Sequence, residues 1–489
     1  MGRRRRPHSL GLIFGELATS TNKSFQHVPG LTSGLIDALL AYGTDEQKRY
    51  YLPKLVTGEW SGTMCLTEPQ CGTDLGLVST RAEVPKDGDG YLLTGTKIWI
   101  TFGEHDMTDN IVHLVLARLP DAPEGIRGIS TFVVPKFLED GTRNPIFCTG
   151  LEHKLGIHAS PTCVMSLEGA RGWLVGEPHR GMKSMFVMMN HARLTVGQEG
   201  ISYGEIAYQT ALAFAKERRQ SRSLDPKKQE ADQKADNILV HPDVRRMLLN
   251  VKASTEAMRA LLFHVAMHLD ASHHHPDEAE RVRSGDLVAL LTPVVKAWTT
   301  ERGFLNVSEA MQVMGGSGYT TDWSVEQYLR DSRIAMIYEG TNHIQALDLV
   351  GRKLPMGGGR LMKTFAAEVT GFIKANADTP AMGEFLGPLK AASKELSDVT
   401  MQLAMKGMAD PEEAGAVASN YLTVFGLTAG AYMMARMAAY ALTRDDRQSR
   451  AKVKTARYYM HNILPETKSL IAIIGAGKAQ MMDFDVDEL

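Results

Sequence analysis

The chain has few cysteines, no long apolar run and almost no net charge. Its 489 residues include four cysteines, Cys65, Cys71, Cys148 and Cys163, without the spacing of CxxC or Cys/His metal sites. This favours a reduced interior over a disulfide framework or a structural metal site. No stretch reaches ~18 uninterrupted apolar residues, so we expect no membrane span. The formal net charge of −2 gives no global basic field and argues against nucleic acid as a partner.

Three short segments depart from this even composition. Residues 3–6 are four arginines, and residues 273–275 are three histidines. An arginine run this short in a tail is typical of a solvated segment, and the histidines favour a loop between helices over a metal site. The apolar residues 10–14 are too few for a signal-peptide core. We therefore expect a cytoplasmic enzyme or binding protein.

The periodicity of the chain changes twice. Residues 10–57 are helical in pattern, and residues 44–47, Thr-Asp-Glu-Gln, indicate a helix start. Short β-branched runs separated by turn residues follow between 60 and 175, which predicts a compact antiparallel β domain. Helical patterns return from about 180, with an exposed loop at residues 222–236 and a glycine break at 357–359. We predict domains at 1–60, 61–175, 176–354 and 355–489, and an α+β fold.

Two segments of the β region carry residues suited to a ligand site. Residues 66–74 read Leu-Thr-Glu-Pro-Gln-Cys-Gly-Thr-Asp, in which Gly72 permits close approach to the backbone. Residues 95–101 read Gly-Thr-Lys-Ile-Trp-Ile-Thr, and strand alternation places Trp99 and Thr101 on one face. An indole beside a hydroxyl suits a planar heteroaromatic ring. Taken alone, the loop is also explained as a simple turn, and Trp99 as a core residue of a barrel.

Two segments of the later helical region also carry residues suited to a ligand site. Residues 312–319, Gln-Val-Met-Gly-Gly-Ser-Gly-Tyr, predict a helix that ends in a glycine turn open to a phosphate or ribityl chain. They lack the GxGxxG pattern after a strand, so a Rossmann interpretation fails. Residues 337–345 read Ile-Tyr-Glu-Gly-Thr-Asn-His-Ile-Gln. An apolar neighbourhood would raise the pKa of Glu339 toward neutrality, as a general base requires. The alternative is a glutamate that begins a helix near the positive end of its dipole.

In this order, and with Arg193 in a helical stretch between them, the four segments resemble the acyl-CoA dehydrogenase family. The resemblance covers roughly residues 15–354. The sequence His-Pro-Asp-Val-Arg-Arg-Met-Leu at 241–248 and the helical extension after 355 look most similar to the branch of 3-methylthiopropionyl-CoA dehydrogenases. The resemblance implies N-terminal helices, a central antiparallel β-barrel, a C-terminal four-helix bundle and an extra C-terminal helical extension.

The resemblance also implies a role for each matching residue. Glu339 matches the catalytic base, whereas Ala192, at the position where some relatives carry the base, cannot accept a proton. The residues implied at the FAD cofactor are Leu66, Thr67, Gly72, Thr73, Trp99, Thr101, Arg218, Gln312, Gly316, Thr341 and His343. Those implied at the substrate are Thr73, Arg193, Tyr338 and Gly340. Arg218 corresponds to an arginine that reaches the cofactor of a neighbouring subunit, and no metal is implied.

The chain departs from the family pattern in three places. Residues 70–73 read Gln-Cys-Gly-Thr where Gly-Ala-Gly-Ser is usual, and Arg218 is followed by Arg-Gln-Ser where Thr-Phe-Gly is frequent. The family carries a longer helical stretch before the Thr-Glu-Pro loop than the 66 residues of this chain. We therefore expect a shortened N-terminal helical domain.

The implied reaction is the oxidation of an acyl-CoA thioester to a trans-2-enoyl-CoA, with Glu339 removing the α-proton. The implied partners are the acyl-CoA substrate, an electron-transfer flavoprotein and a second copy of the chain in a homodimer. Fatty acid metabolism or the degradation of dimethylsulfoniopropionate is the implied context. An acyl-CoA oxidase and a non-catalytic scaffold of the same fold are the alternatives. A mono-oxygenase or nitroalkane oxidase usually replaces the glutamate, which is present here.

Overall fold

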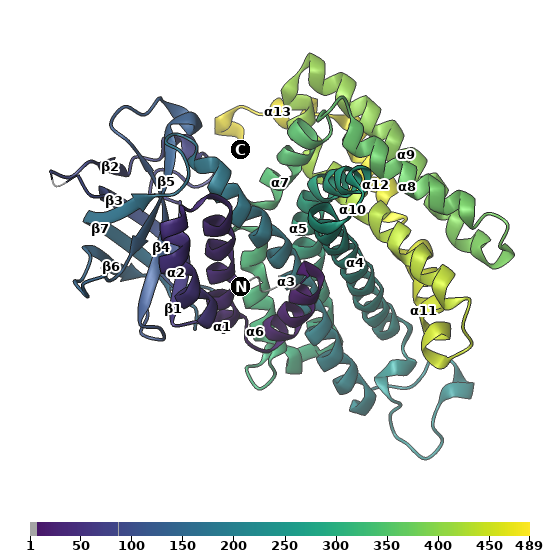
Figure 1. Cartoon of the computed structure of the whole chain (residues 1–489). Coiled ribbons are helices and arrows are strands. Elements are labelled where there is room, and N and C mark those ends of the chain that lie inside the picture. Colours follow the sequence, from purple (N-terminus) through teal and green to yellow (C-terminus); the bar gives the residue numbers. More distant parts are fainter. Residues whose placement is uncertain (1–6, 87) are drawn as a thin grey trace. The chain divides into compact units, whose positions relative to one another are not determined.

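The computed structural model describes residues 7–86 and 88–489, without the side chains of Val187, Asn190 and His191. The arginine run at residues 3–6 lies outside the described residues. The chain forms two compact units. One, Thr21–Thr195, contains the strands and is called the β unit; the other, Met1–Ser20 with Val196–Leu489, is called the helical unit (Figure 1).

The first helices carry clear sequence signals at their ends. Helix α1 (His8–Tyr42) breaks at Asn22, whose φ of −153° and ψ of 84° are not helical. The side chain of Asn22 accepts a hydrogen bond from the backbone of Phe25 at 3.0 Å, as an N-cap does. Helix α2 (Asp45–Thr57) begins with a capping box between Thr44 and Gln47, which confirms the predicted helix start.

The strands of the β unit form one closed sheet. They are β1 (Trp60–Cys65), β2 (Arg81–Glu83), β3 (Tyr91–Thr101), β4 (Asn110–Arg118), β5 (Ile129–Pro135), β6 (Ile146–Leu151) and β7 (Thr162–Leu174). The order is β1-β4-β2-β3-β7-β5, a further β4–β5 pairing closes it, and β6 pairs with β7. Most pairings are antiparallel as predicted, whereas β1 and β2 both pair with β4 in parallel. Alternation within one strand did not predict this parallel pairing.

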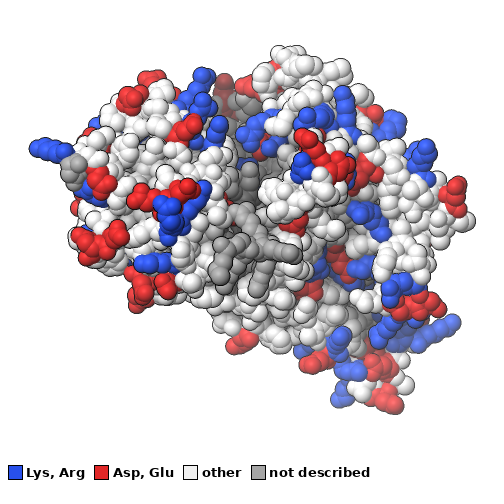
Figure 2. Space-filling model, viewed as in Figure 1, with Lys and Arg blue, Asp and Glu red and all other residues white. Residues whose placement is uncertain are grey.

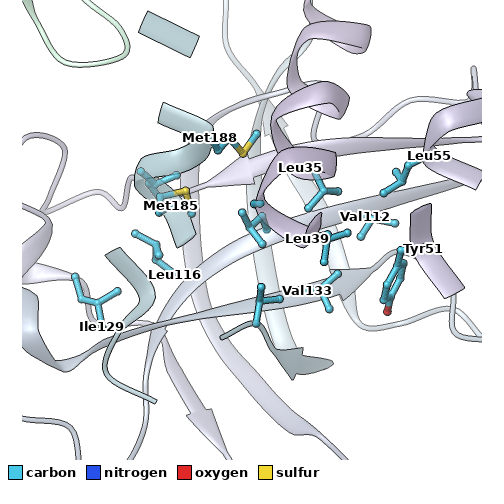
Figure 3. Packing of buried hydrophobic residues seen from close by; sticks show 14 of the residues in the cluster. Leu35, Leu39, Tyr51, Leu55, Val112, Leu116, Ile129, Val133, Met185 and Met188 are labelled. Carbon is cyan, nitrogen blue, oxygen red and sulfur yellow. The ribbon is translucent and has the colours of Figure 1, made fainter. Parts of the chain in front are cut away.

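The core of the β unit lies where its helices cover the sheet (Figure 3). Leu35 and Leu39 of α1 and Leu55 of α2 are almost fully buried against Val112 of β4 and Val133 of β5. Each such side chain contributes about 1.5–3 kcal/mol by leaving water. This packing fixes the sheet that carries the first two site segments.

Long helices make up the helical unit. They begin with α3 (Gly181–Glu217), which starts in the β unit, and continue with α4 (Pro242–His274), α5 (Glu278–Met314), α6 (Val325–Ser332) and α7 (Asn342–Asp348). Gly200 of α3 and Gly303 of α5 touch backbone to backbone: a Cβ on Gly303 would lie 2.4 Å from the Cα of Gly200. The close contact between these helices therefore requires glycine at both positions.

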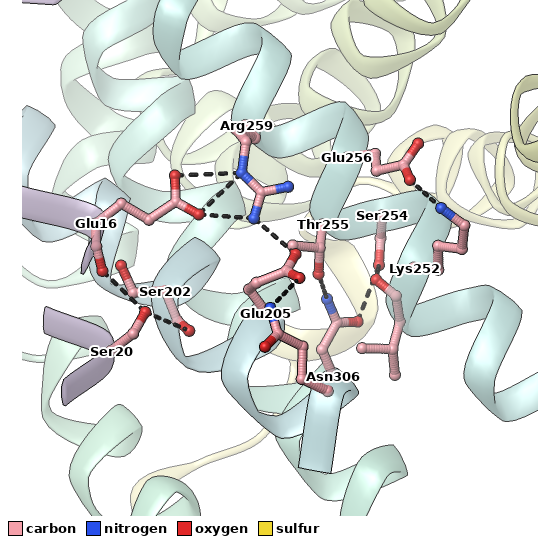
Figure 4. Close-up of polar contacts among 12 residues, drawn as sticks. Glu16, Ser20, Ser202, Glu205, Lys252, Ser254, Thr255, Glu256, Arg259 and Asn306 are labelled. Carbon is pink, nitrogen blue, oxygen red and sulfur yellow. Dashed lines mark hydrogen bonds and ion pairs between the residues drawn. The ribbon is translucent and has the colours of Figure 1, made fainter. Parts of the chain in front are cut away.

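Buried polar contacts fix the helices against one another (Figure 4). Arg259 of α4 donates to Glu16 of α1 at 2.6 Å and to Glu205 of α3 at 2.7 Å. Asn306 of α5 donates to the Thr255 hydroxyl of α4 at 3.1 Å and accepts from another hydroxyl of α4. Such bonds specify which helix faces lie against each other, because a buried polar group without a partner is costly.

The predicted C-terminal extension is helical. It comprises α8 (Arg360–Ala375), α9 (Gly383–Ala409), α10 (Pro411–Ala441), α11 (Arg447–Tyr458), α12 (Glu466–Ala476) and α13 (Ala479–Met482). Trp298 of α5 packs against Gly426 of α10, where a Cβ would meet the indole at 2.3 Å. The predicted loop at 222–236 contains only short 3₁₀ turns and is mainly exposed. The three histidines at 273–275 do not form a loop: the first two end α4 and His275 caps it.

The surface is mixed in charge. On the face shown in Figure 2, acidic and basic side chains are interspersed over both units. All four cysteines are free thiols. Within residues 7–86 and 88–489, no helix is both long enough and apolar enough to cross a membrane.

Candidate active site

The segment that carries Glu339 is a strained turn in the helical unit. It lies between the 3₁₀ turn of Arg333–Met336 and α7. Glu339 has a φ of 58° and Gly340 a φ of 81°, so two consecutive residues are in the left-handed region. Glycine tolerates this conformation, whereas a glutamate there costs energy that the surroundings must offset. Strain of this kind at a residue with a reactive side chain is typical of functional sites.

A fully buried lysine holds this turn from α5. Lys296 donates to the carbonyl of Gly340 at 2.8 Å and to the side-chain oxygen of Asn342 at 3.0 Å. From α7, the Gln345 amide donates to the carbonyls of both Glu339 and Gly340 at 3.2 Å. Two side chains, those of Lys296 and Gln345, thus bind the backbone carbonyls of Glu339 and Gly340 and fix the direction in which the Glu339 carboxyl leaves the turn.

A second carboxylate lies next to the turn. The hydroxyl of Tyr338 donates a short hydrogen bond to Glu199 of α3, which is buried. Burial, followed by the charge of Glu199, raises the pKa of the Tyr338 hydroxyl well above its usual value. The phenol therefore stays protonated and acts as a donor. Through this bond Glu199 holds Tyr338, the residue before Glu339.

The other predicted residues of the helical unit lie at helix ends. Thr341 caps α7 by accepting from the backbone of Ile344 at 3.4 Å. The His343 ring lies 3.0 Å from the hydroxyl of Ser419 on α10. Gln312, in the last turn of α5, is exposed, and so are two residues just beyond helix ends, Gly316 after α5 and Arg218 after α3. A Cβ on Gly316 would meet nothing within 4 Å, so the glycine turn is open to a ligand.

The predicted loop of the β unit is held by a buried ion pair. Lys97 of β3, fully buried, donates to Glu68 at 2.8 Å and to the carbonyl of Leu66 at 3.0 Å. Glu68 also accepts from the backbone and hydroxyl groups of Ser79 and Thr80. Burial alone would raise the pKa of Glu68, but Lys97 and these donors lower it to about 2. Glu68 is therefore ionised and fixes the loop from beneath.

The loop and the Trp99 segment lie together. The backbone N–H of Ile98 donates to the carbonyl of Thr67 at 2.9 Å, which joins the start of the loop to β3. Gly72 and Thr73 are exposed beyond it, Leu66 is buried, and Thr67 is half-buried. The structure thus brings the two predicted segments of the β unit together.

Trp99 leaves the regular strand. The β3–β7 register shifts between Lys97 and Ile100, and Trp99 has a φ of 62°. This bulge interrupts the alternation from which we predicted a shared face for Trp99 and Thr101. The indole is 55% exposed, so the interpretation of Trp99 as a barrel core residue is wrong. Thr101 is half-buried, and Arg193, on α3 within the β unit, is 5% exposed.

The sequence analysis missed the residues that hold the site. Lys97, Lys296 and Glu199 are distant in sequence from the groups they bind, whereas Gln345 lies within one or two helical turns of them; each of the four is nearly fully buried. The available signal was a charged or amide residue within an apolar run, as in Thr-Pro-Val-Val-Lys-Ala-Trp at 292–298. A buried lysine requires a partner. That signal does not name the partner.

Four family models match consecutive parts of the chain. The N-terminal, middle and C-terminal domains of acyl-CoA dehydrogenase match residues 2–59, 63–170 and 179–354. A model described as acetyl-CoA dehydrogenase C-terminal like matches residues 365–485. Together these models cover both site segments and the C-terminal extension.

Individual proteins agree with the models. The chain is 44% identical to 3-methylmercaptopropionyl-CoA dehydrogenase of Ruegeria pomeroyi, over 94% of this chain and 79% of that protein. It is 35% identical to a butyryl-CoA dehydrogenase of Syntrophomonas wolfei, over 89% and 74%. A Bacillus anthracis acyl-CoA dehydrogenase solved with FAD has the same fold, with a TM-score of 0.79, 23% identity and coverage of 95% and 77%. The chain therefore belongs to the acyl-CoA dehydrogenase family of FAD-dependent enzymes.

Proposed function

We propose that this enzyme removes one hydrogen each from the α and β carbons of an acyl-CoA thioester, with Glu339 as the base for the α-proton. The observation that carries the proposal is the left-handed backbone of Glu339, held by Lys296 and Gln345. A chain that needed only a turn would place glycine or asparagine there. The strain is explained if the direction of this carboxyl matters.

A thioester α-proton is weakly acidic, so an ordinary carboxylate needs help to remove it. A base positioned within hydrogen-bonding reach contributes about 10²–10⁴-fold to rate. A backbone N–H group that points at the thioester oxygen would stabilise the enolate that forms when the α-proton leaves. The Gln345 amide donates to the carbonyls of Glu339 and Gly340. The backbone of this turn is therefore oriented before substrate binds. Arg193 and Tyr338 are our candidates for contacts to the substrate.

The two units offer groups that suit FAD. In the β unit, the exposed indole of Trp99 and the hydroxyl of Thr101 would lie against the flavin ring, with Leu66, Thr67, Gly72 and Thr73 beside it. In the helical unit, Arg218, Gln312, Gly316, Thr341 and His343 would contact the cofactor. The open space at Gly316 and the exposure of Arg218 fit phosphate and ribose groups. When bound, FAD supplies the acceptor for the β-hydrogen as hydride.

We propose 3-methylthiopropionyl-CoA as the first substrate to test, and a role in dimethylsulfoniopropionate degradation, because of the likeness to the Ruegeria pomeroyi enzyme. An electron-transfer flavoprotein as acceptor, a homodimer in the cytoplasm and the division at 1–60, 61–175, 176–354 and 355–489 belong to the same proposal. Anaerobic titration of the purified protein with a panel of acyl-CoAs, followed by flavin absorbance, identifies the acyl chain. Peroxide formation without an added acceptor would instead favour an oxidase, and colourless protein a non-catalytic scaffold.

The decisive test of the base is Glu339→Gln. The variant should keep bound flavin and lose roughly 10³-fold or more in turnover, the scale expected for a positioned base. The matched control is Glu326→Gln on α6, where the glutamate pairs with Arg330 on the same helix; it should leave turnover within about twofold because such pairs contribute little. Flavin bleaching by substrate at the wild-type rate in Glu339→Gln would rule out this base.

A further inference from the structure

A large cleft lies in the helical unit. It has a volume of about 1380 Å³ and is formed by α4, α5, α8, α10 and α11. None of residues 338–343 lines it, so it is separate from the turn of the base. Its size exceeds the roughly 300–1,000 Å³ of usual small-molecule pockets. Nothing in the proposed reaction uses it.

One end of the cleft is polar and internally satisfied. Glu368 of α8 accepts from Tyr432 of α10 at 3.0 Å and from Arg283 of α5 at 2.9 Å. Arg283 is also held by Glu280 at 2.7 Å. The rings of His264 and His268, one turn apart on α4, lie beside Glu368, at 3.0 and 3.8 Å from its oxygens. This network forms a rigid end wall.

The two histidines and Glu368 have the composition of a metal site, and their ligand atoms lie within 4.8 Å of one another. The hydrogen bonds argue against a metal. Arg436 of α10 donates to Nδ1 of His264 at 3.0 Å, and an arginine can only donate. His264 must therefore accept at Nδ1 and carry its proton on Nε2, the atom that faces Glu368. That nitrogen has no lone pair left for a cation.

Arg436 is the charge that the cleft leaves uncompensated. Among the other cations that line the cleft, Arg283 pairs with Glu280 and Glu368, Arg444 with Asp446, and Lys452 with Glu256. The guanidinium of Arg436 contacts the neutral His264 ring and the face of Tyr432 at 5.5 Å. Among the described residues no carboxylate lies within ion-pair distance of it. An exposed arginine in this position is open to an anion from solution.

The remaining wall is apolar. Phe263 and Met267 of α4, Phe372 of α8, and Met433 and Met437 of α10 line it. Methionine and phenylalanine side chains adapt to flexible hydrocarbon chains. Within the part of the chain that the structure describes, the cleft therefore offers one cation without a carboxylate partner, Arg436, beside an apolar surface.

We propose that this cleft binds an acyl chain with an anionic head, the head on Arg436 and the chain along the wall of Phe263, Phe372 and Met437. The head can be the carboxylate of a free fatty acid or the phosphates of an acyl-CoA. Both ligands have an anionic head and an acyl chain, the two features that the cleft would bind. The site is additional to the one at which Glu339 acts and needs no reaction.

The experiment measures the binding of a dansyl-labelled C11 carboxylic acid to the full-length enzyme by fluorescence. Arg436→Met removes the charge and keeps an unbranched, flexible side chain, although a shorter one. It should weaken binding about 10- to 100-fold, the scale of a charge-assisted hydrogen bond. Arg444→Gln, in the same cleft but already paired, should change affinity less than threefold, since exposed pairs contribute little.

A second pair of variants tests the place of binding. A side chain at Gly371 of α8 meets nothing within 4 Å and lines the cleft, so Gly371→Trp should fill it and abolish binding. Gly387→Trp on α9 is equally free of contacts but does not line the cleft, so it should bind as the wild type does. Turnover of acyl-CoA should persist in both, which shows that each variant is folded.

Competition identifies the source of the ligand. Displacement by dodecanoate, by dodecanoyl-CoA or by both supports the proposal and names the head group. Equal displacement by uncharged dodecanol, or by CoA without an acyl chain, would overturn it. So would an absence of binding to the wild type, or wild-type affinity in either Arg436→Met or Gly371→Trp.

Discussion

The two site segments are built alike but stabilised differently. Each shows a bulky or charged residue in left-handed backbone, Trp99 in the β unit and Glu339 in the helical unit, and each is held by a fully buried lysine. Lys97 pairs with a carboxylate, Glu68. Lys296 donates to two neutral oxygens of its segment, those of Gly340 and Asn342.

The difference separates two ways to position a loop. An ion pair in a buried place is costly to break, because removal of one partner leaves the other charge desolvated. Hydrogen bonds to neutral oxygens cost less to lose, although each still orients the group it binds. We therefore expect the β-unit segment to respond to substitution through stability, and the segment of the base to respond more through turnover.

Lys97→Met should give the largest loss of stability. Glu68 would stay buried without its cation, which costs about 3–5 kcal/mol in the free energy of unfolding. Urea unfolding measures the loss, and the double variant Lys97→Met, Glu68→Gln should recover much of it. Lys394→Met, which breaks an exposed pair with Asp398, is the control and should cost under about 0.5 kcal/mol. A cost below about 1 kcal/mol for Lys97→Met would remove the contrast between the two segments.

The loss of stability at low pH compares the two units, because each contains a histidine whose pKa is lowered by burial. Burial, helped by nearby cations, lowers the pKa of His113 in the β unit to about 3, and burial lowers that of His268 in the helical unit to about 4. Both values lie below the 6.5 of an unfolded histidine. The unfolded chain therefore binds more protons, and stability that is complete above pH 6.5 is lost as the pH falls toward those values.

The measurement is urea unfolding between pH 6.5 and 4.5. The window ends at the pKa of an unfolded glutamate, 4.5, because below it the stability contributed by Glu68 and Glu368 is lost as well. Each histidine should contribute a slope of up to about 1.4 kcal/mol per pH unit, or roughly 2–3 kcal/mol over this window. His113→Gln and His268→Gln should each flatten the curve by one such contribution. Buried His27 and His105 act in the same direction, so the test is the difference in slope between variant and wild type. An unchanged slope in both variants would contradict the assignment.

Lys296→Met tests the hydrogen bonds by which α5 holds the Glu339 turn. Loss of its hydrogen bonds to Gly340 and Asn342 should cost about 1–3 kcal/mol, the scale expected when buried groups lose their hydrogen-bond partner. Turnover should fall at least tenfold with a smaller change in KM, since the Glu339 turn loses its hold from α5. Stopped-flow flavin reduction separates this from a folding defect. Turnover equal to wild type would show that Gln345 and Asn342 suffice to orient the base.

Local sequence patterns predicted the features that depend on residues close together in the sequence. The helix start at residues 44–47 and the strands between residues 60 and 175 follow from neighbours in sequence. The pairing of Glu68 with Lys97 joins residues 29 apart, and that of Lys296 with Gly340 joins residues 44 apart. Such pairings depend on how elements pack, as do the parallel β1–β4 contact and the bulge at Trp99. The sequence therefore indicated the proposed base, Glu339, and not the groups that hold its turn.

The smallest expected effect isolates the strain at Glu339. Glu339→Gly and Glu339→Ala both remove the carboxyl, so both should lose activity alike, and they differ only in the cost of a Cβ at a φ of 58°. That cost is about 1–2 kcal/mol, so the glycine variant should be the more stable by roughly this amount. At Lys394, inside the regular helix α9, the same comparison should change sign, because alanine is favoured there by about 1 kcal/mol over glycine. Paired urea melts of the four variants give both differences. If the alanine variant were the more stable at both positions, the turn would relax once the glutamate is removed. The left-handed backbone would then be imposed by contacts of the Glu339 side chain and not by the hydrogen bonds from Lys296 and Gln345.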